Sequence, residues 1–121
     1  MSTRSLIGYD DGVIHGIYCH YDGVPEHVGR LLVKHHNSLD ACTYIMEGSQ
    51  IRNFDNDGTV VRFGDCDGST CHEVYSDVKD ALNSCYDYVY LYDWKVNSWS
   101  CFTLEYPSKT LKRVIIPSDD E

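Results

Sequence analysis

Apolar and polar residues alternate along two neighbouring segments near the start of the chain. Thr3 to Tyr9 has the pattern of a strand, and Val13 to His20 continues the same alternation. Asp11 and Gly12 stand between them, and this dipeptide is a strong signal for a tight hairpin turn. The pattern therefore predicts a hairpin in which Cys19 and His20 point to opposite faces.

A helical pattern follows this hairpin. Pro25 suits the first position of a helix, because the N–H that proline lacks would have no partner there. Asn37 is predicted to end this helix and Ser38 to cap a second one, which stops at Gly48. The residues predicted to face inward are Val28, Leu31, Leu32 and His35 in the first helix and Leu39, Cys42, Ile45 and Met46 in the second.

The middle of the chain carries weaker signals. Gln50 to Asp57 is predicted to be irregular, Thr59 to Phe63 to form a short strand, and Asp65 to Cys71 to form a polar loop. Ser76 is predicted to cap a third helix. The apolar stripe of that helix consists of Val78, Ala81, Leu82 and Cys85.

Tyrosine recurs at every second position of the segment YDYVYLYDW, which begins at residue 86. A strand here would place four tyrosines on one face: Tyr86, Tyr88, Tyr90 and Tyr92. Such a face could be core covered by helices, an interface between subunits, or a surface on which ligand bases stack. Ser98 to Glu105 is predicted to be the next strand, and Leu111 to Ile116 an edge strand or an arm onto a partner subunit.

These elements predict one α+β domain over residues 1–117, followed by an acidic tail over residues 118–121. The expected architecture is an antiparallel sheet of about five strands with two to three helices packed on one face. The chain has 121 residues, of which 42% are apolar, and this is enough for a real core.

The net charge of −9 changes the range of partners that the chain can have. General binding to nucleic acid or to an anionic membrane is not expected, because lysine and arginine drive such binding. A few arginines could still concentrate positive charge around a small anionic ligand. The same charge also fits an alternative, a protein-binding inhibitor that imitates nucleic acid and presents a continuous acidic face without a cavity.

The compartment follows from signals that the sequence lacks. No stretch approaches the length of a membrane span, and the first residues lack the apolar core of a signal peptide. A cytosolic protein is therefore expected, in which the six cysteines are buried thiols rather than disulfides.

The junction between the second strand and the first helix collects residue types that bind anions. Tyr18, His20 and Tyr21 end the strand beside a helix N-terminus, a place that suits a phosphate group. Arg30 projects from the first turns of the helix, and Arg4 lies next to Tyr18 and His20 in the hairpin. These residues are the predicted anion site.

A purely structural interpretation of the same stretch stays open. In that interpretation Asp22 caps the helix, Tyr21 packs on the core, and Arg4 and Arg30 are exposed solubilising charges.

Two other groups resemble metal sites. The spacing of Cys66, Cys71 and His72 misses the usual zinc patterns. The segment from Asn53 to Gly58 matches the start of a calcium loop, but Gly64 stands where the bidentate glutamate is needed. We expect a turn in the second group, and neither a metal nor a cofactor in the protein.

Catalytic motifs are missing from the sequence. It contains no phosphate-binding P-loop, no dinucleotide fingerprint and no nucleophile elbow. No spacing pairs a nucleophile with a base, so we do not expect an enzyme.

Two motifs nevertheless resemble a known family. TRSLIG at residues 3–8 and IYCHYDGVPEHVGRLL at residues 17–32 resemble a widespread family of small bacteriophage proteins. The pattern of that family is T-R-S-x-I-G, then I-Y-C-H-W-D-G-x-P-E-x-x-G-x-x-L, and an aromatic hairpin similar to YVYLYDW and SWSCF often ends it. The resemblance is good up to His35, weaker at the hairpin and negligible between them. Tyr21 stands where tryptophan is common, which could alter ligand selectivity.

The resemblance implies a function. The family is similar to the anti-CBASS sponges, with which phages sequester cyclic nucleotide or cyclic ADP-ribose signals of bacterial immunity. It implies a non-catalytic homo-oligomer in the host cell cytoplasm that binds a small anionic nucleotide. The implied pocket consists of Arg4, Tyr18, His20, Asp22 and Arg30, with Tyr21 as a stacking ring.

Overall fold

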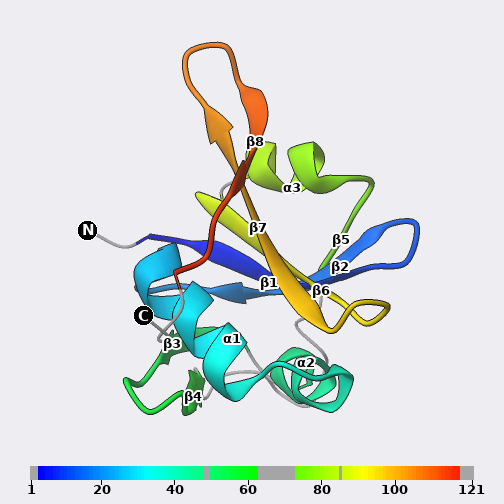
Figure 1. Ribbon diagram of the computed structural model, residues 1–121. Coiled ribbons are helices and arrows are strands. Elements are labelled where there is room, and N and C mark those ends of the chain that lie inside the picture. Colours follow the sequence, from blue (N-terminus) through cyan, green and yellow to red (C-terminus); the bar gives the residue numbers. More distant parts are fainter. Residues whose placement is uncertain (1–2, 48–49, 63–72, 85, 118–121) are drawn as a thin grey trace.

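The computed structural model describes residues 3–47, 50–62, 73–84 and 86–117, and it has an α+β fold (Figure 1). The predicted fold class is therefore confirmed. In chain order the elements are β1 (Ser5–Asp10), β2 (Ile14–Cys19), the π-helix η1 (Pro25–Gly29), α1 (Arg30–His35), α2 (Leu39–Met46), β3 (Ile51–Phe54), β4 (Val60–Arg62), β5 (Glu73–Tyr75), α3 (Val78–Ser84), β6 (Tyr88–Asp93), β7 (Ser98–Glu105) and β8 (Thr110–Val114).

These strands form one open, mixed sheet rather than the antiparallel sheet of about five strands that the pattern predicts. The sheet has eight strands in the order β4-β3-β2-β1-β6-β7-β8, and β5 pairs with β2. The β1–β2 hairpin turns at Asp11 and Gly12 as expected. Two pairings, β1 with β6 and β2 with β3, are parallel, because long connections that contain helices return the chain in the same direction.

One face of the sheet carries the larger core. Ile7 and Ile17 point to this face, where they pack with Leu32 of α1 and Ile45 of α2, and all four side chains are fully buried. Pro25 opens η1 as predicted, and the Ser38 hydroxyl accepts a hydrogen bond of 3.0 Å from the Ala41 N–H at the start of α2. η1, α1 and α2 therefore cover this face together (Figure 1).

The opposite face is covered by α3, which corrects the expectation that the helices pack on one face. Leu6 and Val89 point to this side and pack with Ala81 and Leu82 of α3. An amphipathic pattern shows that a helix is half-buried, but it does not show which sheet face the helix covers. The N-cap of α3 is also corrected: Asp77, not Ser76, accepts the hydrogen bond of the Asp80 N–H, at 2.7 Å.

The tyrosine row is mostly core. Tyr88, Tyr90 and Tyr92 pack in the cluster beneath η1, α1 and α2, and Tyr90 and Tyr92 are almost completely buried. Tyr86 precedes β6 and packs instead in the cluster under α3, so the four tyrosines do not share one face. Of the three predicted roles, the structure supports core for most of the row.

Two strands were not predicted. β3 forms within the segment that was expected to be irregular, and β5 immediately follows a stretch outside the described residues. Both are short and pair with β2, at Cys19 and at Ile14 to Gly16 respectively. Their partner strand, rather than their own pattern, fixes them in the sheet.

The segment near the end of the chain was predicted to be either an edge strand or an arm onto a partner subunit, and it forms an edge strand. β8 pairs antiparallel with β7 and is the last strand of the sheet. The β7–β8 hairpin projects beyond the sheet and the helices, as the orange segment of Figure 1 shows. The predicted tail over residues 118–121 lies outside the described residues.

Candidate functional site

Backbone hydrogen bonds hold the junction that follows β2 in place. The N–H groups of His20 and Tyr21 donate to the carbonyls of Ile51 and Arg52, at 3.0 and 2.9 Å. The Gly23 N–H donates to the Thr3 carbonyl at 3.0 Å. The motif between residues 17 and 32 therefore binds the ends of β1, β2 and β3 together.

Gly23 is required by a close approach at this junction. A Cβ atom at this position would lie 2.8 Å from the Ser5 hydroxyl oxygen and 2.8 Å from the Thr3 carbonyl oxygen. The hydroxyl of Tyr90, a buried core residue, donates a hydrogen bond of 2.6 Å to the Gly23 carbonyl. Part of the resemblance motif therefore has a structural reason, since Ser5, Gly23 and Tyr90 meet at one packed point.

Three of the predicted site residues form an aromatic cluster on the α3 side of the sheet. The Tyr18 hydroxyl is hydrogen-bonded to His20 Nδ1, and the Tyr21 ring lies edge-on to His20 with centroids 4.3 Å apart. Tyr18 also contacts the buried Tyr86 ring, with centroids 5.9 Å apart. Tyr21 is 40% exposed and is not packed on the core, in contrast to the structural interpretation.

A carboxylate extends this aromatic cluster. Glu73 Oε1 accepts hydrogen bonds from the hydroxyls of Tyr75 and Tyr86, both at 2.5 Å. Burial raises the pKa of both tyrosines above the ordinary value, and the hydrogen bonds to Glu73 raise it further. Both phenols therefore remain neutral donors at physiological pH.

Arg4 and Asp22 lie at the margins of the same junction and are exposed. Arg4 is held through its backbone, because its N–H donates to the Asp87 carboxylate at 3.1 Å and its carbonyl accepts from the Asp87 N–H at 2.9 Å. Asp22 has a φ of 57°, which the turn requires, and no side chain caps η1. The cap predicted for Asp22 is therefore not formed.

Arg30 lies on the other side of the molecule from the aromatic cluster. It begins α1, which covers the sheet face opposite to the face on which Tyr18 lies. A cavity of about 260 Å³ opens beside it, which we call the basic cleft. The residues that line the basic cleft are Glu26, His27, Arg30, Leu31, Lys34 and Asn56.

The structure therefore separates the predicted residues into two sets. Tyr18 and Tyr21 both contact His20, whereas Arg30 lines the basic cleft together with residues that were not predicted. His27, Arg30 and Lys34 follow one another at spacings of three and four residues, which places them on one side of a helix. That spacing was visible in the sequence, but the contribution of Asn56 was not.

Histidine side chains fix the far wall of the basic cleft. His27 Nε2 donates to the Phe54 carbonyl and His36 Nε2 to the Gly58 carbonyl, both at 2.7 Å. These two bonds attach the β3–β4 connection, which carries Asn56, to η1 and α1. The connection forms the predicted turn, in which the Gly58 N–H donates to the Asp55 carbonyl at 2.8 Å.

His36 makes this attachment sensitive to acid. Burial lowers the pKa of His36 below its ordinary value of 6.5, and nearby His35 lowers it further. The unfolded chain then binds a proton at a higher pH than the folded chain, so stability is complete above about pH 6.5 and falls as the pH drops below it.

We therefore expect the melting temperature to fall between about pH 7.5 and about pH 5.5, and to fall less in His36→Asn. The measurement is thermal unfolding of both proteins at each pH. His15→Asn is the matched control, since His15 lies in β2 and does not contact the β3–β4 connection through any bond described above, and it should keep the full pH dependence. A His36→Asn protein that loses as much as the unmodified chain would contradict the role of His36.

The described cysteines are unreactive, buried thiols. Cys19, Cys42 and Cys101 are free and buried, as predicted, and burial raises the pKa of each thiol to about 12. Within residues 3–47, 50–62, 73–84 and 86–117, no group of three histidine, cysteine or acidic side chains could hold a metal ion. Cys66, Cys71 and His72 lie outside the described residues.

No helix in the described part of the chain is both long enough and apolar enough to cross a membrane. The chain matches no family model, no curated protein and no solved structure.

Proposed function

We propose that this protein binds and sequesters a small anionic nucleotide without converting it. The observation that carries the proposal is the basic cleft, where two of the ten lysines and arginines of a chain with net charge −9, Arg30 and Lys34, line one cavity against a single carboxylate, that of Glu26. Basic side chains that converge in an otherwise acidic protein concentrate positive potential at one place. The resemblance to phage sponges suggests the ligand class: a cyclic oligonucleotide or a cyclic ADP-ribose isomer, bound in the host cell to block defence.

The chemistry of the basic cleft fits the phosphate part of such a ligand. Arg30 can engage phosphate oxygens through two N–H groups, and Lys34 adds a second cation one helical turn further along. The Asn56 amide offers both a donor and an acceptor from the opposite wall. The cleft is about 260 Å³, slightly below the usual range of about 300–1,000 Å³ for ligand pockets, so the base would extend out of it.

The same cleft favours this proposal over the acidic inhibitor. An inhibitor that imitates nucleic acid was expected to present a continuous acidic face without a cavity. A cavity that Arg30 and Lys34 line interrupts such a face. The aromatic cluster around Tyr18 and His20 is kept as a second predicted surface, where a base could stack on Tyr21.

The test is a calorimetric titration with cyclic dinucleotides, cyclic trinucleotides and cyclic ADP-ribose isomers. We expect Arg30→Ala and Lys34→Ala each to weaken binding by roughly tenfold to a hundredfold, because each removes a charge-assisted hydrogen bond. Lys79→Ala is the matched control, since Lys79 is an exposed cation on α3, and it should bind as the unmodified chain does. Mass spectrometry should recover the ligand unchanged.

Four outcomes would count against the proposal. Binding of no member of the panel would end it, and an altered ligand would favour an enzyme. An equal loss of affinity in Lys79→Ala would mean that only the net charge matters. If Tyr18→Ala and His20→Ala abolish binding while Arg30→Ala does not, the aromatic cluster carries the site instead.

A further inference from the structure

The β7–β8 hairpin carries exposed apolar side chains. Tyr106 is 71% exposed, Leu111 43% and Ile115, just after β8, 90%. β8 is an edge strand, and its residues 110–113 are all exposed. Exposed apolar groups on a projecting edge strand are typical of surfaces that bind another protein.

The same hairpin is basic. Residues 105–115, which we call the cationic hairpin, contain Lys109, Lys112 and Arg113 and a single acidic residue, Glu105. Three of the ten lysines and arginines of the chain are therefore concentrated here, and the rest of the chain carries the excess of negative charge. The surface that this hairpin fits best is acidic and partly apolar.

Such a surface lies elsewhere on the same chain. A cavity of about 510 Å³ opens between the end of β1 and the β6–β7 turn, and we call it the acidic cavity. Its carboxylates come from Asp10, Asp11 and Asp93, and the Trp94 ring beside them is 39% exposed. Its full lining is Asp10, Asp11, Gly12, Leu91, Tyr92, Asp93, Trp94, Lys95, Ser100 and Phe102.

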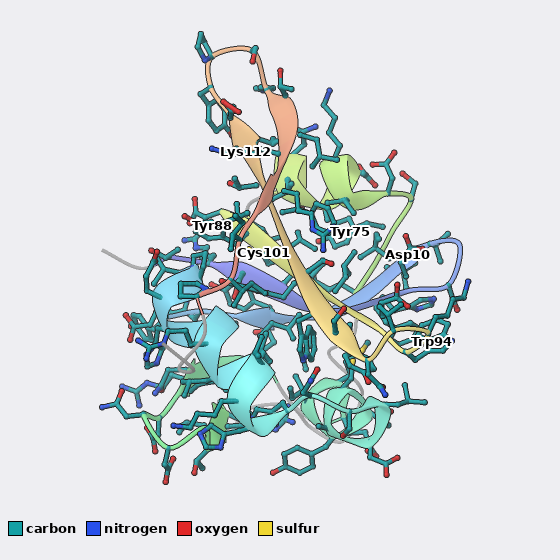
Figure 2. All side chains as sticks on the ribbon, viewed as in Figure 1. Asp10, Tyr75, Tyr88, Trp94, Cys101 and Lys112 are labelled. Atoms are coloured by element: carbon teal, nitrogen blue, oxygen red, sulfur yellow. The ribbon has the colours of Figure 1, made fainter. Side chains whose placement is uncertain are left out.

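The tip of the cationic hairpin lies apart from the acidic cavity within one copy, whereas Arg113, near the base of the hairpin, donates at 3.1 Å to the hydroxyl of Ser100, which lines the cavity. Figure 2 shows Asp10 and Trp94 next to each other at one end of the sheet, well away from Lys112 on the projecting hairpin. The hairpin continues β7 and β8 in the direction away from the β6–β7 turn (Figure 1). A contact between the tip of the hairpin and the acidic cavity therefore requires two molecules.

We propose that the cationic hairpin of one copy docks into the acidic cavity of a second copy. Lys109 and Lys112 meet the carboxylates of the cavity, and Tyr106 and Leu111 pack on Trp94 and the apolar wall of the cavity. Because the two surfaces differ, the contact is head-to-tail, and repeating it gives a ring or a filament.

A second copy fits this surface better than nucleic acid does. A polyanion would gain from the three cations of the hairpin but would be repelled by the rest of a chain with net charge −9. The acidic cavity has three carboxylates against one lysine, Lys95, together with an aromatic ring, and the hairpin has three basic side chains against one carboxylate, Glu105. Both halves of a complementary pair are therefore present in one sequence.

The experiment is sedimentation velocity over a wide concentration range, with charge reversals on either side of the contact. Lys112→Glu alters the hairpin and Asp93→Lys alters the acidic cavity, and each should weaken self-association by roughly tenfold or more. Lys79→Glu and Asp40→Lys are the matched controls, because they make the same charge changes at exposed positions on α3 and α2. Both controls should associate as the unmodified chain does.

Mixing the two variants gives the sharpest result. Lys112→Glu keeps an intact acidic cavity and Asp93→Lys keeps an intact hairpin, so a mixture contains one unaltered contact and one in which both charges are exchanged, and it should recover the self-association that each variant alone has lost. The proposal fails if the unmodified chain stays monomeric at millimolar concentration, or if the mixture forms no dimer. Retention of the unmodified chain on heparin, lost in Lys112→Glu but without self-association, would assign the hairpin to a polyanion instead.

Discussion

Replacing Tyr90 by alanine is expected to lower the free energy of unfolding by about 3–5 kcal/mol. Tyr90 is fully buried at the centre of the larger core, where Gly29 of η1 and the sheet meet. Truncation to alanine removes the ring and leaves a cavity that the rigid sheet and the helix can only partly fill. Urea denaturation monitored by circular dichroism measures the change.

Tyr90→Phe separates the ring from the hydroxyl. The hydroxyl donates to the Gly23 carbonyl at 2.6 Å, so its loss should cost about 1 kcal/mol, the usual net value of one hydrogen bond. Tyr106→Ala is the matched control, because Tyr106 is a tyrosine that is 71% exposed, and it should change stability by less than about 0.5 kcal/mol. Equal losses in Tyr90→Ala and Tyr106→Ala would contradict the buried role of Tyr90.

Local signals in the sequence predicted the local structure well. Asp11 and Gly12 form the predicted hairpin turn, Pro25 begins a helix, and Ser38 caps the next one. Each of these residues acts on its immediate neighbours, so no knowledge of the rest of the fold is needed. The cap of α3 was misplaced by only one residue, because Ser76 and Asp77 are both good capping residues.

Features that depend on distant partners were not predicted. β5 has only three residues and is held by pairing with Ile14 to Gly16 of β2. Tyr86 does not share a face with the other three tyrosines, because β6 begins at Tyr88. This boundary depends on the pairing of β6 with β1. Alternation fixes which residues share a face only after the ends of a strand are known.

The candidate site shows the same division. Alternation along β2 brought Tyr18 and His20 together as expected, because His20 directly follows the strand and lies on the same face as Tyr18. Arg30 was expected to join them, but η1 and α1 pack on the opposite face, a choice that depends on the whole core. The basic cleft also needs Asn56, which reaches it from the β3–β4 connection through a long-range contact.

Replacing Gly23 by alanine is expected to lower the free energy of unfolding by about 1–3 kcal/mol, as overpacking of a filled site does. The new Cβ would lie 2.8 Å from both the Ser5 hydroxyl oxygen and the Thr3 carbonyl oxygen, so the loop must move away from β1. That movement would also strain the hydrogen bond from the Gly23 N–H to the Thr3 carbonyl. Chemical denaturation of the variant measures the loss.

A double-mutant cycle with Ser5→Ala locates the cause of that loss. Ser5→Ala removes the hydroxyl that the new methyl group would contact, so the double variant should be more stable than the sum of the two single changes by at least about 0.5 kcal/mol. Additive effects would assign the strain to the Thr3 carbonyl oxygen and the Ser5 Cβ, which would lie 2.8 and 2.9 Å from the new methyl group and which Ser5→Ala leaves in place. The motif around Gly23 also carries Tyr21 and leads into Arg30, so ligand binding measured on Gly23→Ala and Arg30→Ala separates the packing role of the motif from its binding role. Gly23→Ala should lower the free energy of unfolding. Arg30→Ala should lower the affinity for the ligand and leave the free energy of unfolding unchanged.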